Sequence, residues 1–370
     1  MRPAPPLDLS KLKVYPLSSR RSLTRVESIL IDPDSTAPNF TTEKTNKSLF
    51  DCAARIREAR QNNASVMLIY GAHLLRNGAA RILDSLMEAG WITHLATNGA
   101  GSIHDWEYAW LGASTEGVEE NVATGTFGTW DETSKYIHTA LMSGALEELG
   151  YGSSLGRFIC ENGTHIPEAA ELRAQITASP EHPLCGARAD LLNAIRTGYI
   201  IPGKLDLKHL WPHASIFASA WKHKIPLTVH PGVGYDIIAN HPIFSGSVIG
   251  RAAASDFRLF GGAVENLDGG VVISIGSAIM GPQVFEKSIS CVNNLRLQSG
   301  RDVVKGHSVH VVDLQDGGGW DWNKGEPPKS SPAYYLRFCK SFSRMGALLD
   351  YIQADNAAFV HALWHLLKTS

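Results

Sequence analysis

A continuous apolar run, a helical pattern and a second apolar run follow one another between residues 65 and 97. The first run, SVMLIYG at 65–71, is typical of a strand that is covered on both faces of a sheet. Residues 73–90 then repeat leucine, isoleucine and alanine at three- or four-residue steps, and Gly90 is placed to end a helix. The second run, WITHLAT at 91–97, completes a βαβ unit, in which a right-handed crossover makes the two strands parallel.

The same alternation returns in the second half of the chain. It predicts an α/β protein with a doubly wound, mostly parallel sheet. Residues 1–47 show no sustained apolar period, so we expect an N-terminal arm followed by one large α/β domain at 48–370, with a helical insertion at about 117–205. The later helices and strands are expected at 213–224, 225–230, 250–267, 269–276, 282–297, 308–314 and 355–367.

The composition favours a small-molecule substrate over a polymeric partner. The formal net charge is −2, so we expect no basic surface for nucleic acid or for an anionic membrane. The longest apolar stretch, residues 269–281, falls short of the roughly 20 residues that cross a bilayer. The N-terminus lacks the apolar core of a secretory signal, and the five cysteines form no CxxC pair. These features predict a cytoplasmic protein.

Small residues follow four of the predicted strands. Ligands of open parallel sheets bind beyond the carboxyl ends of the strands, where loops meet helix N-termini. A pyrophosphate can approach backbone N–H groups there only if no Cβ stands in the way, although a single glycine more often just closes a turn. No GxGxxG motif follows the first strand, so the ordinary Rossmann fingerprint is absent. The small residues in these loops include Gly71, Gly99, Gly101, Gly232, Gly276 and Ser277.

A histidine and two acids follow the second of these loops. His104, Asp105 and Glu107 fall in the first turn of the helix expected after Gly101, where the helix dipole favours acids. Asp105 and Glu107 are therefore either capping charges or acceptors for ribose hydroxyls. His104 is a candidate for moving a proton, because its unperturbed pKa is about 6.5.

A second polar group follows the strand expected at 225–230. His230 and His241 flank the segment PGVGYDIIAN, and Asp236 lies between them. With His104 and Asp105, these are residue types that a metal-dependent hydrolase uses. The spacings HxH, HExxH and CxxC are all missing, so no metal is predicted and the hydrolase is kept as an alternative. No GxSxG follows a strand, which argues against a serine nucleophile.

Residues 311–332, VVDLQDGGGWDWNKGEPPKSSP, form one long loop rich in glycine and proline. Such a stretch is either a mobile surface loop or a lid that closes over a ligand. As a lid, it would place Trp320 or Trp322 over the ligand and Lys324 beside a carboxylate or phosphate.

Residues 66–105 resemble the deoxyhypusine synthase family, whose members use NAD to move the butylamine part of spermidine onto a protein lysine. The segments IPLTVHPGVGYD, GGVVISIGSAIMG and VHVVDLQDGGG then resemble later family segments in the same order. The resemblance implies the fold of that family, an NAD site and a homotetramer. Positions that match the family's cofactor-facing residues are Thr97, Asn98, Gly99, Gly101, Asp313 and Asp316, and positions that match its acids are Asp105 and Asp236.

Two features of that family have no clear counterpart, namely its histidine pair and its reactive lysine, for which Lys324 is a poor substitute. Hypusine formation is therefore not predicted. The segment TNGAGSIHDWE also resembles NAD-dependent ornithine cyclodeaminases, through its asparagine and its His-Asp-x-Glu.

These observations predict an NAD-binding enzyme that acts on a small amino or hydroxy compound by transient oxidation, followed by elimination or transfer. A nucleotide-binding protein without catalysis is an alternative, as is the metal-dependent hydrolase. The catalytic candidates are His104, Asp105, Glu107, His230, Asp236 and Lys324.

Overall fold

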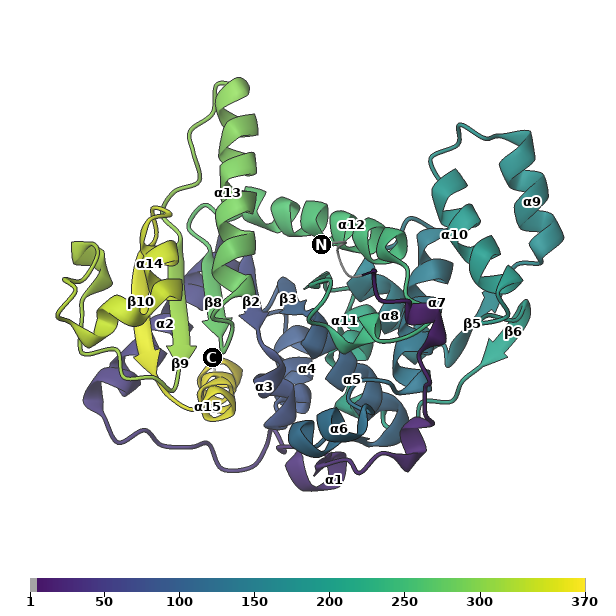
Figure 1. Cartoon of the computed structure of the whole chain (residues 1–370). Helices are drawn as coiled ribbons and strands as arrows, with labels where there is room; N and C mark the ends of the chain where they lie inside the picture. The colour runs from purple at the N-terminus through teal and green to yellow at the C-terminus, as the bar shows by residue number, and fades with distance from the viewer. Residues whose placement is uncertain (1–4, 370) are drawn as a thin grey trace.

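The computed structural model describes residues 5–369, and its centre is one sheet of six parallel strands (Figure 1). Numbered by their order along the chain, the strands lie 3-2-1-4-5-6 from one edge of the sheet to the other. This is the doubly wound Rossmann order, so the predicted fold class is confirmed. From edge to edge the strands are β7 (Leu227–His230), β3 (His94–Asn98), β2 (Val66–Tyr70), β8 (Val271–Ile275), β9 (Ser308–Asp313) and β10 (Leu348–Gln353).

Helices cover both faces of the sheet, as the continuous apolar strands require. Successive side chains of a strand point to opposite faces. Leu68 and Tyr70 of β2 therefore belong to one core, and Met67 and Ile69 to a second core. Figure 1 shows α12 and α13 on one side of the sheet and α15 and α4 on the other. The first core packs on α2 (Glu43–Gln61), α4 (Ala80–Glu88), α11 (Ile216–His223) and α15 (Asn356–Lys368), and the second on α12 (Gly246–Glu265), α13 (Met280–Gln298) and α14 (Arg337–Ser343).

The helix expected at 73–90 is divided into α3 (Ala72–Arg76) and α4. Gly78 lies between them with a φ of +83°, in the left-handed region that favours glycine. A Cβ on Gly78 would stand 1.8 Å from the backbone oxygen of Ile29. The N-terminal arm packs against the chain at this point, so the division of the helix depends on a segment about fifty residues earlier in the sequence.

The N-terminal arm runs along the domain and pairs with it. Its short strand β1 (Thr24–Arg25) is antiparallel to β4 (Ala113–Ser114), which directly follows α5 (Gly99–Leu111). Tyr15 also forms a bridge with Trp130. The other short elements of the arm are η1 (Leu9–Lys11), η2 (Leu17–Ser19) and α1 (Val26–Ile29).

Between β4 and β7 lies a mostly helical segment. Its helices α7 and α8 pack against the domain, whereas α9, α10 and the hairpin of β5 and β6 lie together at one end of the molecule in Figure 1. No helix among residues 5–369 combines the length and the apolar character needed to cross a bilayer. The elements of this segment are α6 (Val118–Thr124), α7 (Asp131–Ala145), α8 (Tyr151–Cys160), β5 (Gly163–Ile166), α9 (Ala169–Ala178), α10 (Cys185–Arg196), β6 (Gly203–Asp206) and η3 (Pro212–Ala214).

Candidate functional site

A cavity of about 260 Å³ opens beside the carboxyl ends of β3 and β7. Its wall combines α3, α5, the segment after β4, the loop after β7 and one residue of the N-terminal arm. We call it the α5 cavity. It lies at the carboxyl ends of the strands, where ligands of doubly wound folds bind, and to one side of the point between β2 and β8 at which the strand order reverses. Its ionisable lining residues are Arg20, Arg76, His104, Glu107, Glu116, Tyr235 and Asp236, of which the sequence predicted His104, Glu107 and Asp236.

A chain of hydrogen bonds fixes the protonation of His104. The Nδ1 atom of His104 lies 2.7 Å from Ser114 Oγ, and this hydroxyl donates to Glu107 Oε2 over 2.5 Å. Because the hydroxyl proton goes to the carboxylate, Nδ1 is the donor to Ser114 and Nε2 carries the lone pair. Burial lowers the pKa of His104 to about 4. The ring is therefore neutral at neutral pH and able to accept a proton from a molecule in the cavity.

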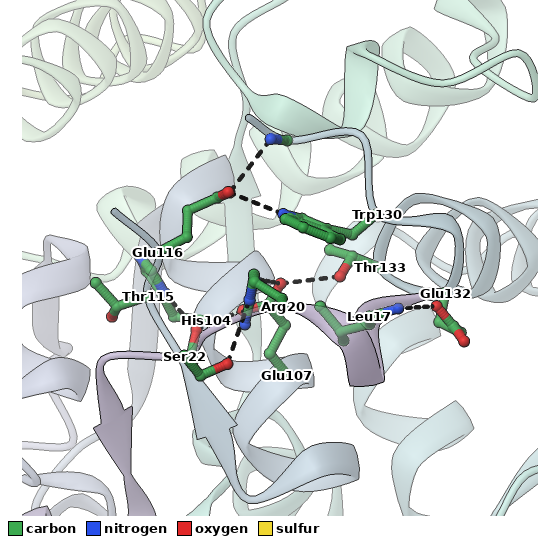
Figure 2. A network of polar contacts seen from close by, with 12 residues as sticks. Leu17, Arg20, Ser22, His104, Glu107, Thr115, Glu116, Trp130, Glu132 and Thr133 are labelled. Atoms are coloured by element: carbon green, nitrogen blue, oxygen red, sulfur yellow. Dashed lines mark hydrogen bonds and ion pairs between the residues drawn. The ribbon is translucent and has the colours of Figure 1, made fainter. Parts of the chain in front are cut away.

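Glu107 stays charged because it is paired inside the protein. Both of its oxygens accept hydrogen bonds from the Arg20 guanidinium, each over 2.8 Å, and Thr133 donates to Oε1 over 2.8 Å (Figure 2). Burial acts to raise the pKa of Glu107, but the charge and hydrogen bonds of Arg20 hold it below its usual range. One of our hypotheses was that Glu107 accepts hydrogen bonds from ribose hydroxyls. With these partners in place, its carboxylate is not free to do so.

Asp105 points away from the cavity and accepts hydrogen bonds at the start of another helix, α11. Its carboxylate accepts hydrogen bonds from the Ser215 hydroxyl and, over 2.7 Å, from the N–H of Ile216 at the start of α11. Burial raises the pKa of Asp105 to about 7. It does not line the α5 cavity. Because α5 begins at Gly99, Asp105 and Glu107 lie beyond its first turn and do not cap α5 as expected; Asp105 instead accepts from the start of α11.

Asp236 reaches the cavity from the loop after β7. Its Oδ2 atom accepts a hydrogen bond from the N–H of Gly232 over 2.7 Å. Burial raises the pKa of Asp236 to about 6. The cavity therefore holds a histidine with a lowered pKa and an aspartate with a raised pKa, from two elements far apart in the sequence.

His230, the last residue of β7, is not brought to the cavity. Its Nε2 atom lies 3.2 Å from Thr228 Oγ1, and its ring stands edge-on to Phe260, with 5.3 Å between the ring centroids. Burial lowers the pKa of His230 to about 4. These contacts place His230 in the packing between β7 and α12.

The glycines expected to cradle a pyrophosphate are crowded by protein atoms. A Cβ on Gly71 would stand 2.2 Å from the backbone oxygen of Gly276, so the loops after β2 and β8 touch where the strand order reverses. The space beside each of the five loop glycines is therefore filled by the protein itself, so packing explains their small size without a pyrophosphate. The atoms nearest to a Cβ on the other four are Asp236 Oδ2 for Gly99, Thr97 Oγ1 for Gly101, the Tyr235 ring for Gly232 and Asn356 Nδ2 for Gly276.

The polar residues of the same loops are occupied by local hydrogen bonds. Asn98 caps α5, accepting from the N–H of Gly101 over 2.9 Å, and Thr97 donates to the Tyr70 carbonyl over 3.0 Å. Ser277 accepts from the N–H of Gly281 over 3.1 Å at the start of α13. These bonds explain the three residues without a cofactor.

The loop at 311–332 does not cover the α5 cavity. Trp322 is a core residue with 3% exposure, and the Asn323 side chain hydrogen-bonds the backbone of Leu349 at the amino end of β10. Lys324 therefore lies toward the opposite edge of the sheet, where it contacts Asp321 over 3.7 Å. The lid hypothesis is not supported by this placement. Asp313 ends β9 and accepts from the N–H of Gln315, and Asp316 follows β9 and accepts from the N–H of Gly318.

The candidate metal ligands are dispersed. Within residues 5–369, no three His, Cys, Asp or Glu side chains come together to hold a metal ion. His241 Nε2 instead lies 3.1 Å from Asp131. The described residues therefore provide no set of metal ligands for a metal-dependent hydrolase.

Sequence reasoning missed Arg20, Arg76 and Glu116. Glu116 accepts a hydrogen bond from Trp130 Nε1 over 2.9 Å (Figure 2). It also accepts from the N–H of Gly128 over 3.2 Å. Arg20 belongs to the arm and Arg76 ends α3, so neither lies in a strand-end loop. The one available signal was the position of Glu107 inside a helix that is expected to be buried, because a buried carboxylate needs a cation as its partner.

Comparison with known proteins gives distant structural likeness only. No family model matches the sequence, and no curated protein matches it. Apo ArgZ, an arginine dihydrolase from the ornithine-ammonia cycle in Cyanobacteria, aligns at a TM-score of 0.40 and 11% identity, over 89% of this chain and 33% of ArgZ. The complex of AgrE with ornithine and NAD+ aligns at a TM-score of 0.42 and 12% identity, over 90% of this chain and 34% of AgrE.

A third solved structure has a length closer to that of this chain. A conserved protein of Methanococcus maripaludis S2, described as LOR/SDH, aligns at a TM-score of 0.41 and 13% identity, over 96% of this chain and 76% of its own. This chain spans only about a third of ArgZ and AgrE. At these TM-scores the likeness carries no functional argument, and the Rossmann-like α/β fold rests on the strand order of the chain itself.

Proposed function

We propose that this protein is an enzyme that performs acid–base chemistry on a small molecule in the α5 cavity, with His104 as the base. The observation that carries the proposal is the hydrogen-bond chain from His104 through Ser114 to Glu107. It holds the imidazole in one tautomer and leaves Nε2 as the acceptor. A base that is oriented by a second group, which is itself fixed by a charge pair, is a recurring arrangement in proton-transfer sites.

Asp236 is the acid that complements His104. Two titratable groups whose surroundings move their pKa values in opposite directions within one cavity are the pattern expected of an acid and a base. Burial raises the pKa of Asp236 and lowers the pKa of His104. His104 would take a proton from the bound molecule, and protonated Asp236 would donate one.

A nicotinamide dinucleotide is the cofactor that we propose. Support comes from the strand order and from the position of the α5 cavity on the carboxyl edge of the sheet. The contact between Gly71 and Gly276 argues against a ready-made pyrophosphate site, so we derive no chemical step from the cofactor. The transient oxidation of an amino or hydroxy compound that the family resemblance implies depends on the same cofactor.

Release of the cofactor tests this part of the proposal. We expect NAD+ or NADH in the supernatant when the purified protein is denatured, or else binding of added NAD+ in equilibrium dialysis. Absence of both would remove NAD from the proposal and leave the acid–base chemistry to be judged separately.

Proton exchange tests the acid–base chemistry. The protein is incubated in D2O with a panel of small amino and hydroxy compounds, and deuterium uptake at carbon is followed by mass spectrometry. We expect uptake with the unmodified protein and loss of uptake with His104→Gln. Uptake that is the same in both proteins, or uptake of none of the compounds, would contradict the proposal. A nucleotide-binding protein without catalysis would release NAD and exchange no proton.

A further inference from the structure

Arg76 is a cation without a partner in the wall of the α5 cavity. It is the last residue of α3, and its guanidinium makes no hydrogen bond or ion pair with any other residue in the described part of the chain. Its Nε atom is buried and has no partner there. A buried donor that is left unsatisfied typically costs about 1–3 kcal/mol, and more when the group is charged. Such a cost is tolerated where a ligand supplies the missing acceptor.

Arg20 and Glu116, the other arginine and a second acid of the cavity, already have hydrogen-bond partners. Arg20 is paired with Glu107 through two hydrogen bonds. Glu116 accepts from Trp130, Gly128 and Asn121, which are neutral donors. Of the two arginines that line the cavity, Arg76 alone is available to a ligand.

We propose that the α5 cavity binds a small monocarboxylate, that is, a singly charged anion, and that Arg76 is the residue that holds it. This inference rests on the proposed acid–base function and names its substrate class. A guanidinium matches a carboxylate with two parallel hydrogen bonds, which fixes the orientation of the ligand as well as its position. His104 lines the same cavity, so a carboxylate on Arg76 would be held in the cavity that contains the base.

The charge of the cavity favours one negative charge on the ligand over two. Arg76 supplies a single unpaired positive charge, whereas Glu116 lines the same cavity with a carboxylate that has only neutral donors. A phosphate carrying two charges would therefore find one cation and face a group of like charge. The cavity volume of about 260 Å³ is also that of a small ligand.

Arg76 and His104 interact electrostatically. After burial and Glu107, the charge of Arg76 is the next influence on the pKa of His104, and it lowers that pKa. A carboxylate bound to Arg76 would cancel part of this effect, so we expect ligand binding to raise the pKa of His104. The substrate would thus strengthen the base that acts on it.

Protection from phenylglyoxal, a reagent for free guanidinium groups, tests the proposal in the complete protein. Peptide mass spectrometry after limited reaction should show Arg76 modified and the paired Arg20 spared. Pyruvate, as a monocarboxylate probe, should protect Arg76, and inorganic phosphate should protect it less. The proposal is overturned if Arg76 does not react, if pyruvate fails to protect it, or if phosphate protects it better.

Two variants with a matched control measure the binding itself. Pyruvate affinity, followed by ligand-observed NMR, should fall about tenfold or more in Arg76→Gln, as loss of a charge-assisted hydrogen bond predicts. Arg76→Lys keeps the charge and should recover part of the affinity. Arg81→Gln changes a surface arginine on α4 that pairs with Asp32, and it should bind as the unmodified protein does. Thermal unfolding of each variant checks the fold.

The same measurements separate this inference from the proposed function. His104→Gln should keep its pyruvate binding and its protection of Arg76 while losing proton exchange. Unchanged binding in Arg76→Gln would overturn the carboxylate proposal and leave the role of His104 untouched. Normal pyruvate binding together with exchange that does not depend on His104 would overturn the acid–base function alone.

Discussion

Arg20 and Glu107 form a two-point ion pair in which both side chains are almost completely excluded from solvent. The two residues lie 87 positions apart, one in the N-terminal arm and the other in α5. The arm is therefore part of the wall of the α5 cavity. Because Glu107 also receives the Ser114 hydroxyl, the ion pair fixes the charge at the end of the hydrogen-bond chain from His104.

The ion pair predicts a strong dependence of stability on Arg20. Arg20→Met leaves Glu107 as an unpaired buried charge, which typically costs about 3–5 kcal/mol. We expect the free energy of unfolding, measured by urea denaturation, to fall by that amount. The double variant Arg20→Met/Glu107→Gln removes both charges and should regain much of the loss.

The neighbouring arginine provides the control. Arg21 is exposed and lies 3.8 Å from Glu120, so Arg21→Met should change the free energy of unfolding by less than about 1 kcal/mol. Equal losses for the Arg20 and Arg21 variants would show that the buried pair contributes no more than a surface contact.

His104 is predicted to carry its proton on Nδ1. In 15N-labelled protein, NMR should show Nδ1 protonated and Nε2 unprotonated at neutral pH. The ring should stay neutral until the pH falls close to 4, because burial lowers its pKa to about 4. Ser114→Ala removes the acceptor of Nδ1 and should allow the other tautomer to appear.

A serine on α5, the helix that carries His104, is the control for that experiment. Ser102 bonds to the Gly99 carbonyl and to Tyr151, away from His104. Ser102→Ala should leave the His104 resonances unchanged. A His104 ring protonated on Nε2 in the unmodified protein would contradict the proposed role as a base.

Glycines in α5 and α12 are predicted to respond to alanine in opposite directions. A Cβ on Gly101 would stand 2.1 Å from Thr97 Oγ1, which is fully buried, whereas Gly250 in α12 has open space around it. Gly101→Ala should lower the free energy of unfolding by about 1–3 kcal/mol through overpacking. Gly250→Ala should raise it by about 0.5–1 kcal/mol, because alanine loses less entropy in a helix. A tolerated Gly101→Ala would mean that Gly101 is small for a reason other than packing.

The central strands could be predicted from the sequence because they are continuous apolar runs buried on both faces. β10 could not, because its sequence LLDYIQ places Asp350 and Gln353 in an edge strand that is only partly covered. The helix α2 was missed for a related reason. Its core positions are filled largely by small residues such as Cys52 and Ala53 within a polar sequence, so its apolar period is weak.

The site was predictable where it depends on strand ends and unpredictable where it depends on long-range contacts. His104 and Asp236 meet because the carboxyl ends of β3 and β7 are neighbours. Asp105 and Glu107 are two positions apart on α5, so they point to different sides of the helix, one toward α11 and the other toward Arg20. The spacing of the acids shows this divergence, but only the packing shows which acid faces the cavity.

Acid titration of His94 is predicted to destabilise the sheet. His94 is the first residue of β3. Its Nε2 atom lies 3.1 Å from Thr228 Oγ1, and its ring stands edge-on to Phe260. Burial, and then the charge of His230, lowers its pKa from 6.5 to about 3. Since the folded pKa is below the unfolded value, the unfolded state binds the proton more readily between pH 6.5 and 3. The stability that depends on neutral His94 is therefore lost as the pH falls through this window.

His94→Gln removes this titration and keeps a polar partner for Thr228. The difference in free energy of unfolding between the unmodified protein and this variant should change in favour of the variant as the pH falls, by at most about 1.4 kcal/mol for each pH unit. Urea denaturation between pH 7 and pH 4.5 measures it. Phe260→Leu disturbs the same packing without removing a titrating group, so its effect should vary less with pH. Parallel pH profiles for the unmodified protein and His94→Gln would show that His94 takes up its proton equally in the folded and unfolded states.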